Sequence, residues 1–220
     1  MSDHPVQRGA LLVFEGLDRS GKSTQVGLLE KRLCDQGVAA SVQRFPDSAL
    51  QCGAIARQYL QQTRSLDDHV IHLIFTANRW EAAKSIRERI ARGETVIVDR
   101  YSFSGIAYSA TKGMDFDWCA APEIGLPSPD SVFFLTVSED VAASRGGFGD
   151  EIYEKKEFQR KVRVAFDDLK ATQIGKTWNI IDASVSVEDV SKQINEKVDA
   201  VLERIKGTAL ETLTAAHFSK

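Results

Sequence analysis

Residues 16–23 have the types and the spacing of a phosphate-binding loop. Their sequence, Gly-Leu-Asp-Arg-Ser-Gly-Lys-Ser, fits the Walker A pattern G-x-x-x-x-G-K-[ST]. The glycines let successive amide groups face inward as an anion nest, and a helix that begins near Lys22 directs its positive end at the phosphates. Lys22 supplies a mobile charge for the β- and γ-phosphates, and the Ser23 hydroxyl is the expected ligand of Mg²⁺. Because an apolar run at residues 11–14 precedes the pattern and an amphipathic helix follows it, the sequence predicts a nucleoside triphosphate site.

A second apolar run, at residues 95–98, ends in the carboxylate of Asp99. This is the Walker-B-like arrangement that holds Mg²⁺, often through water, although apolar strands that end in aspartate are common in α/β proteins. Arg100 follows at the carboxyl edge of the expected strand, where α/β sheets bind ligands, and an arginine there can clamp a phosphate with two hydrogen bonds. A solvated surface ion pair is the alternative interpretation of Arg100.

Phe75 and Arg79 are four residues apart and therefore share one face of an expected helix. An aromatic ring beside a guanidinium suits a nucleobase, because the ring can stack and the guanidinium can donate hydrogen bonds. Arginine only donates, so it favours a carbonyl acceptor such as thymine O4 over the amino group of cytosine. Spacing alone favours a plainer arrangement, with Phe75 in the core and Arg79 reaching outward to solvent.

The elements that must position these residues are five short apolar runs that alternate with helix-length segments. The runs lie at residues 10–14, 39–44, 95–98, 131–137 and 178–181, and the helical segments at 22–36, 49–62, 67–92, 103–110, 154–172 and 187–206. This alternation predicts parallel βαβ units and a three-layer α/β fold. Residues 113–129, which contain three prolines, indicate a surface crossing, and the glycine-rich residues 145–149 fit either a mobile flap or a plain turn.

The composition is that of one soluble globular domain of 220 residues, 43% hydrophobic and 27% charged. The net charge of −3 argues against a nucleic-acid-binding surface, although a small anionic substrate needs only a local basic cluster. We expect no secretory signal, and no membrane span because no apolar stretch approaches about 20 residues. The three cysteines lack metal-site spacing and indicate reduced thiols in a cytoplasmic protein, with nuclear sharing left open.

Several separate motifs make the sequence resemble the thymidylate kinase family, close to its eukaryotic-type members, from about residue 9 to residue 206. The shared stretches lie at residues 15–25, 44–46, 72–80, 99–105, 117–119, 125–130, 145–154 and 182–184. The resemblance implies a P-loop nucleoside monophosphate kinase fold, an α/β architecture with a five-stranded parallel sheet flanked by helices and a lid at about residues 142–157. The implied activity is ATP-dependent phosphorylation of thymidine monophosphate (dTMP) to the diphosphate, for dTTP synthesis, with Mg²⁺ as cofactor.

The resemblance also implies a homodimer that associates through segments 67–92 and 103–110. The whole chain, residues 1–220, would form a single kinase domain with a flexible N-terminus at residues 1–8. The C-terminal tail, residues 207–220, carries Leu210, Leu213 and Phe218. These apolar side chains leave open whether the tail packs back on the domain or stays free.

The resemblance assigns roles to individual residues as well. Asp18 would accept a hydrogen bond from the 3′-hydroxyl of dTMP, and the catalytic residues would be Arg19, Lys22, Asp99 and Arg100. Ser23 and Asp99 would hold the metal, directly or through water. The implied ATP site comprises Arg19, Ser20, Gly21, Lys22, Ser23, Thr24, Arg145, Ala183 and Ser184. The implied acceptor site comprises Asp18, Phe45, Leu60, Phe75, Arg79, Arg100, Ser104, Gly105, Tyr108, Tyr153 and Glu154.

Within the implied acceptor site, Phe75 stacks on thymine and Arg79 binds its O4 atom. Arg100 holds the acceptor phosphate, and Tyr108 lies under the sugar where a ribose 2′-hydroxyl would clash. Ser104 and Gly105 line the base pocket.

Two positions depart from the family pattern. Ser48 stands where eukaryotic-type members usually carry an arginine that contacts the acceptor phosphate, so that contact is either missing or supplied by Arg44, Arg57 or Lys112. Losing one charge-assisted hydrogen bond costs about 1.5–3 kcal/mol, which weakens acceptor binding without abolishing the chemistry. Val185 stands where a longer polar residue can occur near adenine, so the donor base would rest on backbone contacts.

Three other functions compete with this interpretation. A related monophosphate kinase with a broader acceptor range, including dUMP or dGMP, shares most of the motifs. A GTPase-type switch requires an Asn-Lys-x-Asp motif after a strand, whereas residues 195–199 read Asn-Glu-Lys-Val-Asp within an expected helix. A catalytically inactive homologue is disfavoured because the acidic and basic residues expected to be catalytic are all present.

Overall fold

One parallel sheet forms the centre of the molecule. The computed structural model describes residues 7–138, 141, 152–153 and 155–220. Within these residues the five strands are arranged in the order β2-β3-β1-β4-β5, and every neighbouring pair is parallel. Their bounds are β1 Leu11–Gly16, β2 Ala40–Arg44, β3 Thr95–Asp99, β4 Ser131–Thr136 and β5 Asn179–Asp182. The predicted α/β fold with a five-stranded parallel sheet is confirmed, and each strand lies within two residues of its expected position.

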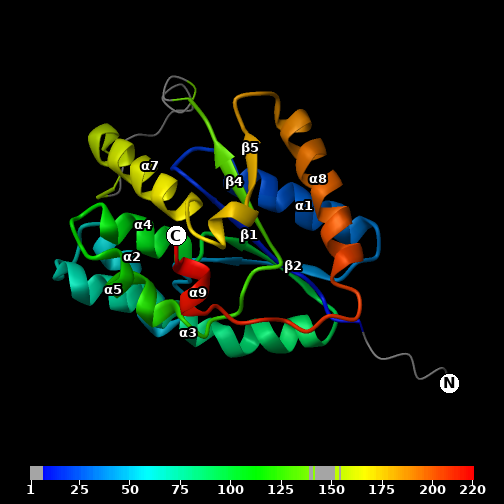
Figure 1. Cartoon of the computed structure of the whole chain (residues 1–220), viewed down its shortest axis with the longest axis horizontal. Coiled ribbons are helices and arrows are strands. Elements are labelled where there is room, and N and C mark those ends of the chain that lie inside the picture. The colour runs from blue at the N-terminus through cyan, green and yellow to red at the C-terminus, as the bar shows by residue number, and fades with distance from the viewer. Residues whose placement is uncertain (1–6, 139–140, 142–151, 154) are drawn as a thin grey trace.

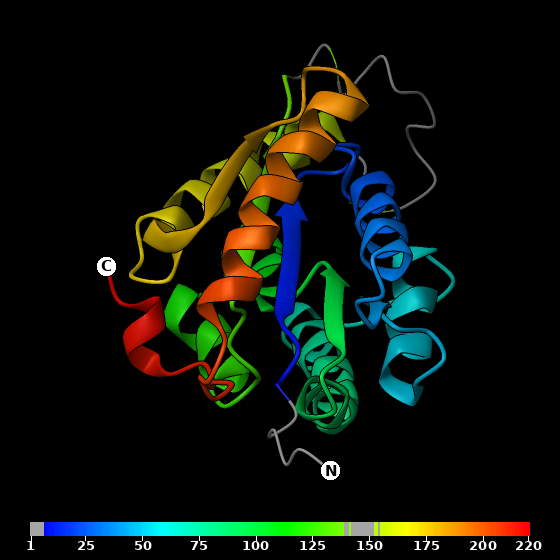
Figure 2. The same ribbon diagram turned by 90° about the vertical axis from the view of Figure 1, so that its right-hand side faces the viewer.

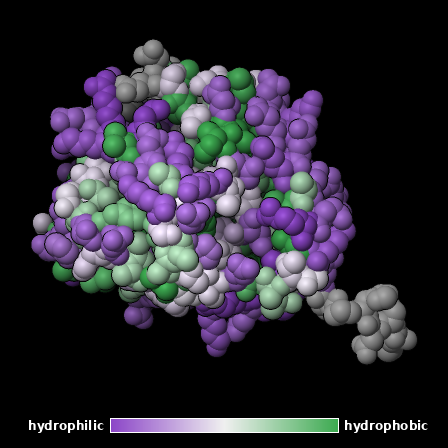
Figure 3. Space-filling view, viewed as in Figure 1, coloured by the Kyte–Doolittle hydropathy of each residue, from purple (hydrophilic) through white to green (hydrophobic). Residues whose placement is uncertain are grey.

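Helices cover both faces of this sheet (Figures 1 and 2). On one face lie α1 (Lys22–Asp35) and α8 (Val187–Arg204), and on the other lie α3 (Asp68–Ala91), α4 (Ser102–Ala110) and α7 (Lys156–Lys170). The helix α2 (Gln51–Leu60) packs against α3. The face seen in Figure 3 is mostly hydrophilic, because the helices turn their apolar sides toward the sheet.

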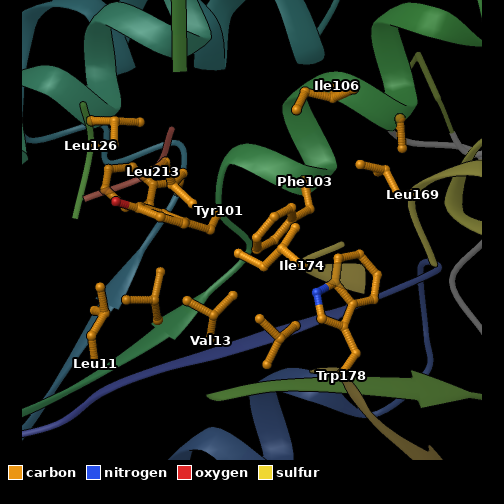
Figure 4. Close-up of a cluster of buried hydrophobic side chains, with 14 of the residues drawn as sticks. Leu11, Val13, Tyr101, Phe103, Ile106, Leu126, Leu169, Ile174, Trp178 and Leu213 are labelled. Carbon is orange, nitrogen blue, oxygen red and sulfur yellow. The ribbon is translucent and has the colours of Figure 1, made fainter. Parts of the chain in front are cut away.

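The two cores follow from the alternation of side chains along the central strands. Leu11 and Val13 point to the α3–α4–α7 side, whereas Leu12 and Phe14 point to the α1–α8 side, and all four are completely buried. Figure 4 shows Val13 of the first core close to Phe103 and Trp178. A strand that is buried on both faces needs continuous apolar sequence, which is why these runs were recognisable.

The prediction of a surface crossing at residues 113–129 holds only in part. This segment contains a short helix, α5 (Phe116–Ala120), and a 3₁₀ turn, η1 (Ala121–Glu123). The carboxylate of Asp115 accepts a hydrogen bond from the Trp118 amide at 2.8 Å and so caps α5. Cys119, Glu123 and Leu126 are completely buried, whereas Trp118 and Ile124 are exposed, so one side of the segment packs into the domain.

The C-terminal tail packs back on the domain. Leu213 exchanges backbone hydrogen bonds of 2.8 Å with Gly125 and Leu126, and the Leu213 side chain enters the core. The tail ends in α9 (Ala215–Phe218), and a second 3₁₀ turn, η2 (Gly175–Thr177), precedes β5. Phe218 is only 5% exposed. Burial of these two apolar side chains holds the tail, which runs beside the segment before β4 (Figure 1).

Arg8 is anchored although it belongs to the N-terminal segment expected to be flexible. Its guanidinium donates two hydrogen bonds, of 2.7 and 2.8 Å, to the carboxylate of Asp130, and its Nε donates to the Thr208 carbonyl oxygen at 2.8 Å. Most of the expected lid, residues 142–157, lies outside the described residues. In the part of the chain that the structure describes, no helix has the length and apolar character that a bilayer crossing requires.

Candidate active site

A cavity of about 540 Å³ lies beside the carboxyl ends of β1 and β3. Its walls come from the loop between β1 and α1, the loop after β2, and the helices α2, α3 and α4. Most of the residues predicted from the sequence line it together. These are Asp18, Arg19, Gly21, Lys22, Ser23, Thr24, Phe45, Leu60, Phe75, Arg79, Asp99, Arg100, Ser104, Gly105, Tyr108 and Tyr153.

The phosphate-binding loop has the geometry that its glycines predict. Gly16 has φ 137°, and a Cβ atom there would lie 2.4 Å from the Leu135 carbonyl oxygen. Gly21 has φ 94° and precedes the first residue of α1, so the first turn of that helix lines the cavity. The first four amide groups of a helix lack carbonyl partners within it, and they carry the positive end of its dipole. The loop therefore offers an anion site.

Lys22 lies folded against this loop. Its Nζ donates to the carbonyl oxygens of Gly16 and Leu17 at 3.1 and 2.7 Å and to the Ser20 hydroxyl at 3.3 Å. Burial lowers the pKa of Lys22 to about 8, and the positive charge of Arg100 is the second, smaller cause. A phosphate anion in the loop would favour the charged form of this lysine.

The hydroxyl of Ser23 donates to Oδ2 of Asp99 at 2.7 Å, which places the two predicted metal ligands together. Asp99 is 3% exposed, and its Oδ2 also accepts from Arg44 Nε at 3.2 Å. Two hard oxygen ligands fit Mg²⁺, which usually takes one or two protein ligands and completes its shell with water and substrate phosphates. Among the described residues, no group of three or more His, Cys, Asp or Glu side chains is arranged so that it could hold a metal ion.

Asp18 and Arg100 form an ion pair across the middle of the cavity. Arg100 Nη2 donates to Asp18 Oδ1, and Nη1 donates to the Ser104 hydroxyl at 3.2 Å. The Tyr108 hydroxyl donates to Asp18 Oδ2 at 3.3 Å, and the Arg100 guanidinium lies 5.5 Å from the centre of the Tyr108 ring. The predicted clamp Arg100 and the predicted hydroxyl acceptor Asp18 therefore lie side by side.

Glu15 is a site residue whose role the sequence analysis did not identify. Its carboxylate is completely buried and accepts from the Tyr101 and Ser104 amides at 2.9 and 3.0 Å, and from the Ser104 hydroxyl at 2.5 Å. Burial raises the pKa of Glu15, while the Ser104 hydrogen bond and the charge of Arg100 act against that rise. Glu15 thereby ties β1 to the first turn of α4, directly after Arg100, whose backbone is left-handed with φ 67°. The signal that could have identified Glu15 is a charged residue at the end of an otherwise apolar strand.

Gln159, on α7, is a second residue that the sequence analysis missed. Its amide donates to Asp18 Oδ2 at 2.6 Å and to the Tyr153 carbonyl oxygen at 3.0 Å, and its oxygen accepts from the Asp18 amide at 3.3 Å. It connects α7 with the phosphate-binding loop. A single polar residue on an amphipathic helix carries no signal of this contact.

The far end of the cavity has the character predicted for base binding. Phe75 is half-buried and lines the cavity, whereas Arg79 is only 3% exposed and does not reach outward to solvent. Arg79 Nε donates to Oε2 of Glu123 at 2.8 Å, and Nη2 donates to Oε1. A Cβ atom on Gly105 would lie 2.5 Å from Arg79 Nη2, so the guanidinium rests on the backbone of α4. Nothing in the sequence indicated the role of Glu123.

Some predicted residues lie elsewhere. Ser20 is buried within the loop, and Ala183 and Ser184 follow β5 without lining the cavity. Their contacts with ATP stay predictions. Arg145 and Glu154 lie outside the described residues.

The structure narrows the replacement for the arginine that Ser48 lacks. Ser48 is exposed and does not line the cavity, whereas Arg44 and Arg57 do. Lys112 is bound instead to Asp68, at 2.8 Å, and to the Tyr59 hydroxyl, at 3.0 Å. Arg44 and Arg57 are therefore the arginines placed to take over that contact.

Comparisons with known proteins point to one family. The model of the family described as thymidylate kinase matches residues 14–194. The thymidylate kinase of Arabidopsis thaliana is 49% identical over 207 residues, which cover 94% of this chain and 77% of that protein. The thymidylate kinase of Homo sapiens is 44% identical over 190 residues, covering 86% and 89%. A solved thymidylate kinase from Candida albicans superimposes with a TM-score of 0.86 at 33% identity, covering 94% of this chain and 99% of that one.

Proposed function

Because the chain belongs to the thymidylate kinase family and phosphorylates dTMP to the diphosphate, we propose that it does so by direct in-line transfer within the cavity described above. One observation carries the proposal. A single cavity joins a phosphate-binding loop at one end to an aromatic–guanidinium pair at the other, with Arg100 and Asp18 between them. That arrangement fits two nucleotides that meet at their phosphates.

The chain contributes position and positive charge to the transfer. An oxygen of the dTMP phosphate forms a bond to the γ-phosphorus of ATP as the bond to the β–γ bridging oxygen breaks, and ADP leaves. The first turn of α1 and Lys22 hold the donor phosphates, and Arg19 and Arg100 balance the charge on the transferring group. Ser23 and Asp99 would hold Mg²⁺, which would supply a further positive charge to balance the phosphates.

On the acceptor side, we propose that Phe75 stacks on thymine and that Arg79 donates from Nη1 to O4. Arg100 would hold the acceptor phosphate, and Asp18 would accept a hydrogen bond from the 3′-hydroxyl. Because these two side chains form an ion pair with each other, bound dTMP would be a further partner for both of them. Tyr108 would lie under the sugar. We also propose that residues 183–184 contact adenine and that Arg145 and Glu154 act from the lid.

An assay of ADP release across nucleoside monophosphates tests the acceptor range. We expect dTMP to give a higher kcat/KM than dCMP, because Arg79 offers donors to O4 and disfavours the amino group of cytosine. Uracil and guanine also present a carbonyl oxygen, so dUMP and dGMP test the breadth of the acceptor range. Comparable kcat/KM values for dUMP or dGMP would favour the broader-range kinase, and absence of activity with dTMP would refute the proposal.

We propose a homodimer that associates through the exposed side of α3. The other segment expected at the interface, α4, offers no comparable face, because most of its residues are buried within the domain. Val70, Leu73, Ala77 and Trp80 follow each other at intervals of three and four residues, and Val70, Leu73 and Trp80 are 45%, 46% and 41% exposed. Apolar side chains in such a row mark an association surface.

We expect Leu73→Glu to convert the dimer to a monomer in sedimentation velocity at micromolar concentration, because a carboxylate would be buried without a partner. Val164→Glu is the matched control, because Val164 lies on α7 and is 62% exposed. A wild-type monomer, or a dimer in the Leu73→Glu variant, would exclude this interface.

A further inference from the structure

Arg79, the side chain proposed to bind the base, is paired with the carboxylate of Glu123, which does not line the cavity. Glu123 is completely buried and belongs to η1, while Arg79 belongs to α3 and lines the cavity. Both oxygens of Glu123 accept from this one guanidinium, at its Nε and Nη2 atoms. Two parallel hydrogen bonds between a guanidinium and a carboxylate fix the orientation of the guanidinium plane.

A hydroxyl completes the arrangement. Thr76 Oγ1 donates to Glu123 Oε1 at 2.6 Å and accepts from Arg79 Nη2 at 3.1 Å. The Nε hydrogen and the Nη2 hydrogens of Arg79 are thus committed to these partners. Gly105 bounds the same Nη2 atom on its other side, because a Cβ there would lie 2.5 Å away. Arg79 lines the cavity, and Nη1 is the nitrogen of its guanidinium that is not used in these hydrogen bonds.

The segment that carries Glu123 is held from two directions. Trp80 Nε1, on α3, donates to the Pro122 carbonyl oxygen at 2.9 Å. On the other side, the Gly125 amide donates to the Leu213 carbonyl oxygen of the C-terminal tail at 2.8 Å. Glu123 therefore lies in a segment whose backbone is hydrogen-bonded on both sides of it.

The charges along the cavity differ between its two ends. Apart from Arg79, the described lining residues include the basic side chains of Arg19, Lys22, Arg44, Arg57 and Arg100 and the carboxylates of Asp18 and Asp99. At the base end Arg79 is balanced by Glu123. An unbalanced buried guanidinium there would attract the acceptor phosphate and so favour a reversed acceptor.

We propose that Glu123 is a positioning residue for acceptor selection. It fixes Arg79 so that Nη1 faces the base, and it cancels the charge of Arg79 so that this end accepts a neutral carbonyl and leaves the phosphate to the basic end. The inference rests on the proposed function, and it concerns the base contact alone.

The test compares Glu123→Gln with Glu94→Gln. The control removes the charge from another glutamate–arginine pair, in which Arg89 Nε lies 2.9 Å from Glu94 Oε1, away from the cavity. Each enzyme is assayed with dTMP and with the analogue that carries hydrogen in place of O4, the 5-methyl-2-pyrimidinone deoxynucleotide. For Glu123→Gln we expect the KM for dTMP to rise by about 10- to 100-fold with a smaller change in kcat, the scale of one charge-assisted hydrogen bond.

The decisive readout is selectivity between the two acceptors. We expect the KM for the analogue to change by less than about threefold, because the analogue never made the bond that Glu123 supports. Glu94→Gln should keep the wild-type preference for dTMP. An equal loss with both acceptors, or an unchanged KM for dTMP, would overturn the inference, whereas a wild-type enzyme without dTMP activity would refute the proposed function instead.

A second variant keeps the test decisive if Glu123→Gln does not fold. Gly105→Ala leaves Glu123 in place and displaces the Arg79 guanidinium, because a Cβ atom there would lie 2.5 Å from Nη2 and 3.2 Å from Nη1. Alanine suits the helix α4. We expect the same selective loss with dTMP. A Gly105→Ala enzyme of normal thermal stability that kept the wild-type preference for dTMP over the analogue would contradict a role for Arg79 orientation.

Discussion

Replacing Arg19 with glycine is expected to lower kcat for dTMP phosphorylation by about a thousandfold, the scale of a catalytic arginine at a transferring phosphoryl group. The KM for dTMP should change little, because Arg19 is expected to act on charge that develops during the transfer. Arg19 lines the cavity within the phosphate-binding loop and has a left-handed backbone with φ 66°. Initial-rate kinetics over both substrates measure the two constants.

Alanine at this position separates the side chain from the backbone. Arginine and alanine have the same cost of about 1 kcal/mol at positive φ, whereas glycine adopts this conformation without strain. Equal kcat losses in Arg19→Gly and Arg19→Ala would therefore assign the effect to the missing side chain, and a loss confined to Arg19→Gly would assign it to the altered loop backbone. Arg92→Ala, at an exposed position at the end of α3, is the control. A normal kcat with only the KM raised would remove Arg19 from the transfer step.

Replacing Glu15 with alanine is expected to lower the free energy of unfolding by about 3–5 kcal/mol. The substitution leaves the Tyr101 amide, the Ser104 amide and the Ser104 hydroxyl without the acceptor that they share in the interior. It also releases the first turn of α4 beside Arg100, so kcat should fall together with stability. Urea unfolding followed by circular dichroism measures the first effect.

Glu15→Gln separates the two contributions of this carboxylate. The amide keeps one acceptor oxygen of similar shape but loses the charge, so we expect a smaller loss of stability than for alanine. Glu94→Ala, at a glutamate that is 25% exposed in its ion pair, should cost less than either. If Glu15→Ala unfolds at the same urea concentration as the wild type, Glu15 does not hold β1 to α4.

The site residues that were predicted from local sequence patterns lie in short contiguous segments. Gly16, Gly21, Lys22 and Ser23 act through a contiguous loop whose backbone geometry depends on the glycines within it. Asp99 and Arg100 were recognisable because a buried parallel strand needs an unbroken apolar run and its ligand edge is the carboxyl end. Local sequence is sufficient where the chemistry and the turn that creates it lie within a few residues.

The contacts that the sequence did not predict join residues that are far apart along the chain. Arg79 was identified by its spacing from Phe75, but its buried partner is 44 residues away in a segment expected to lie at the surface. The prolines of that segment predicted loop backbone, and they carried no information about Glu123 being enclosed between α3 and the tail. Whether the tail packs was likewise left open, because Leu213 and Phe218 bury only against the assembled domain.

The sequence by itself determined the parallel α/β sheet, the phosphate-binding loop and the family of the enzyme, because each depends on short contiguous patterns. Only the tertiary structure decided how the acceptor end is held. Glu15 lies 89 residues from Ser104, and Gln159 lies 141 residues from Asp18. A buried polar group is stable only with partners, and the partners that make a carboxylate or an amide useful at this site are chosen by packing between distant elements.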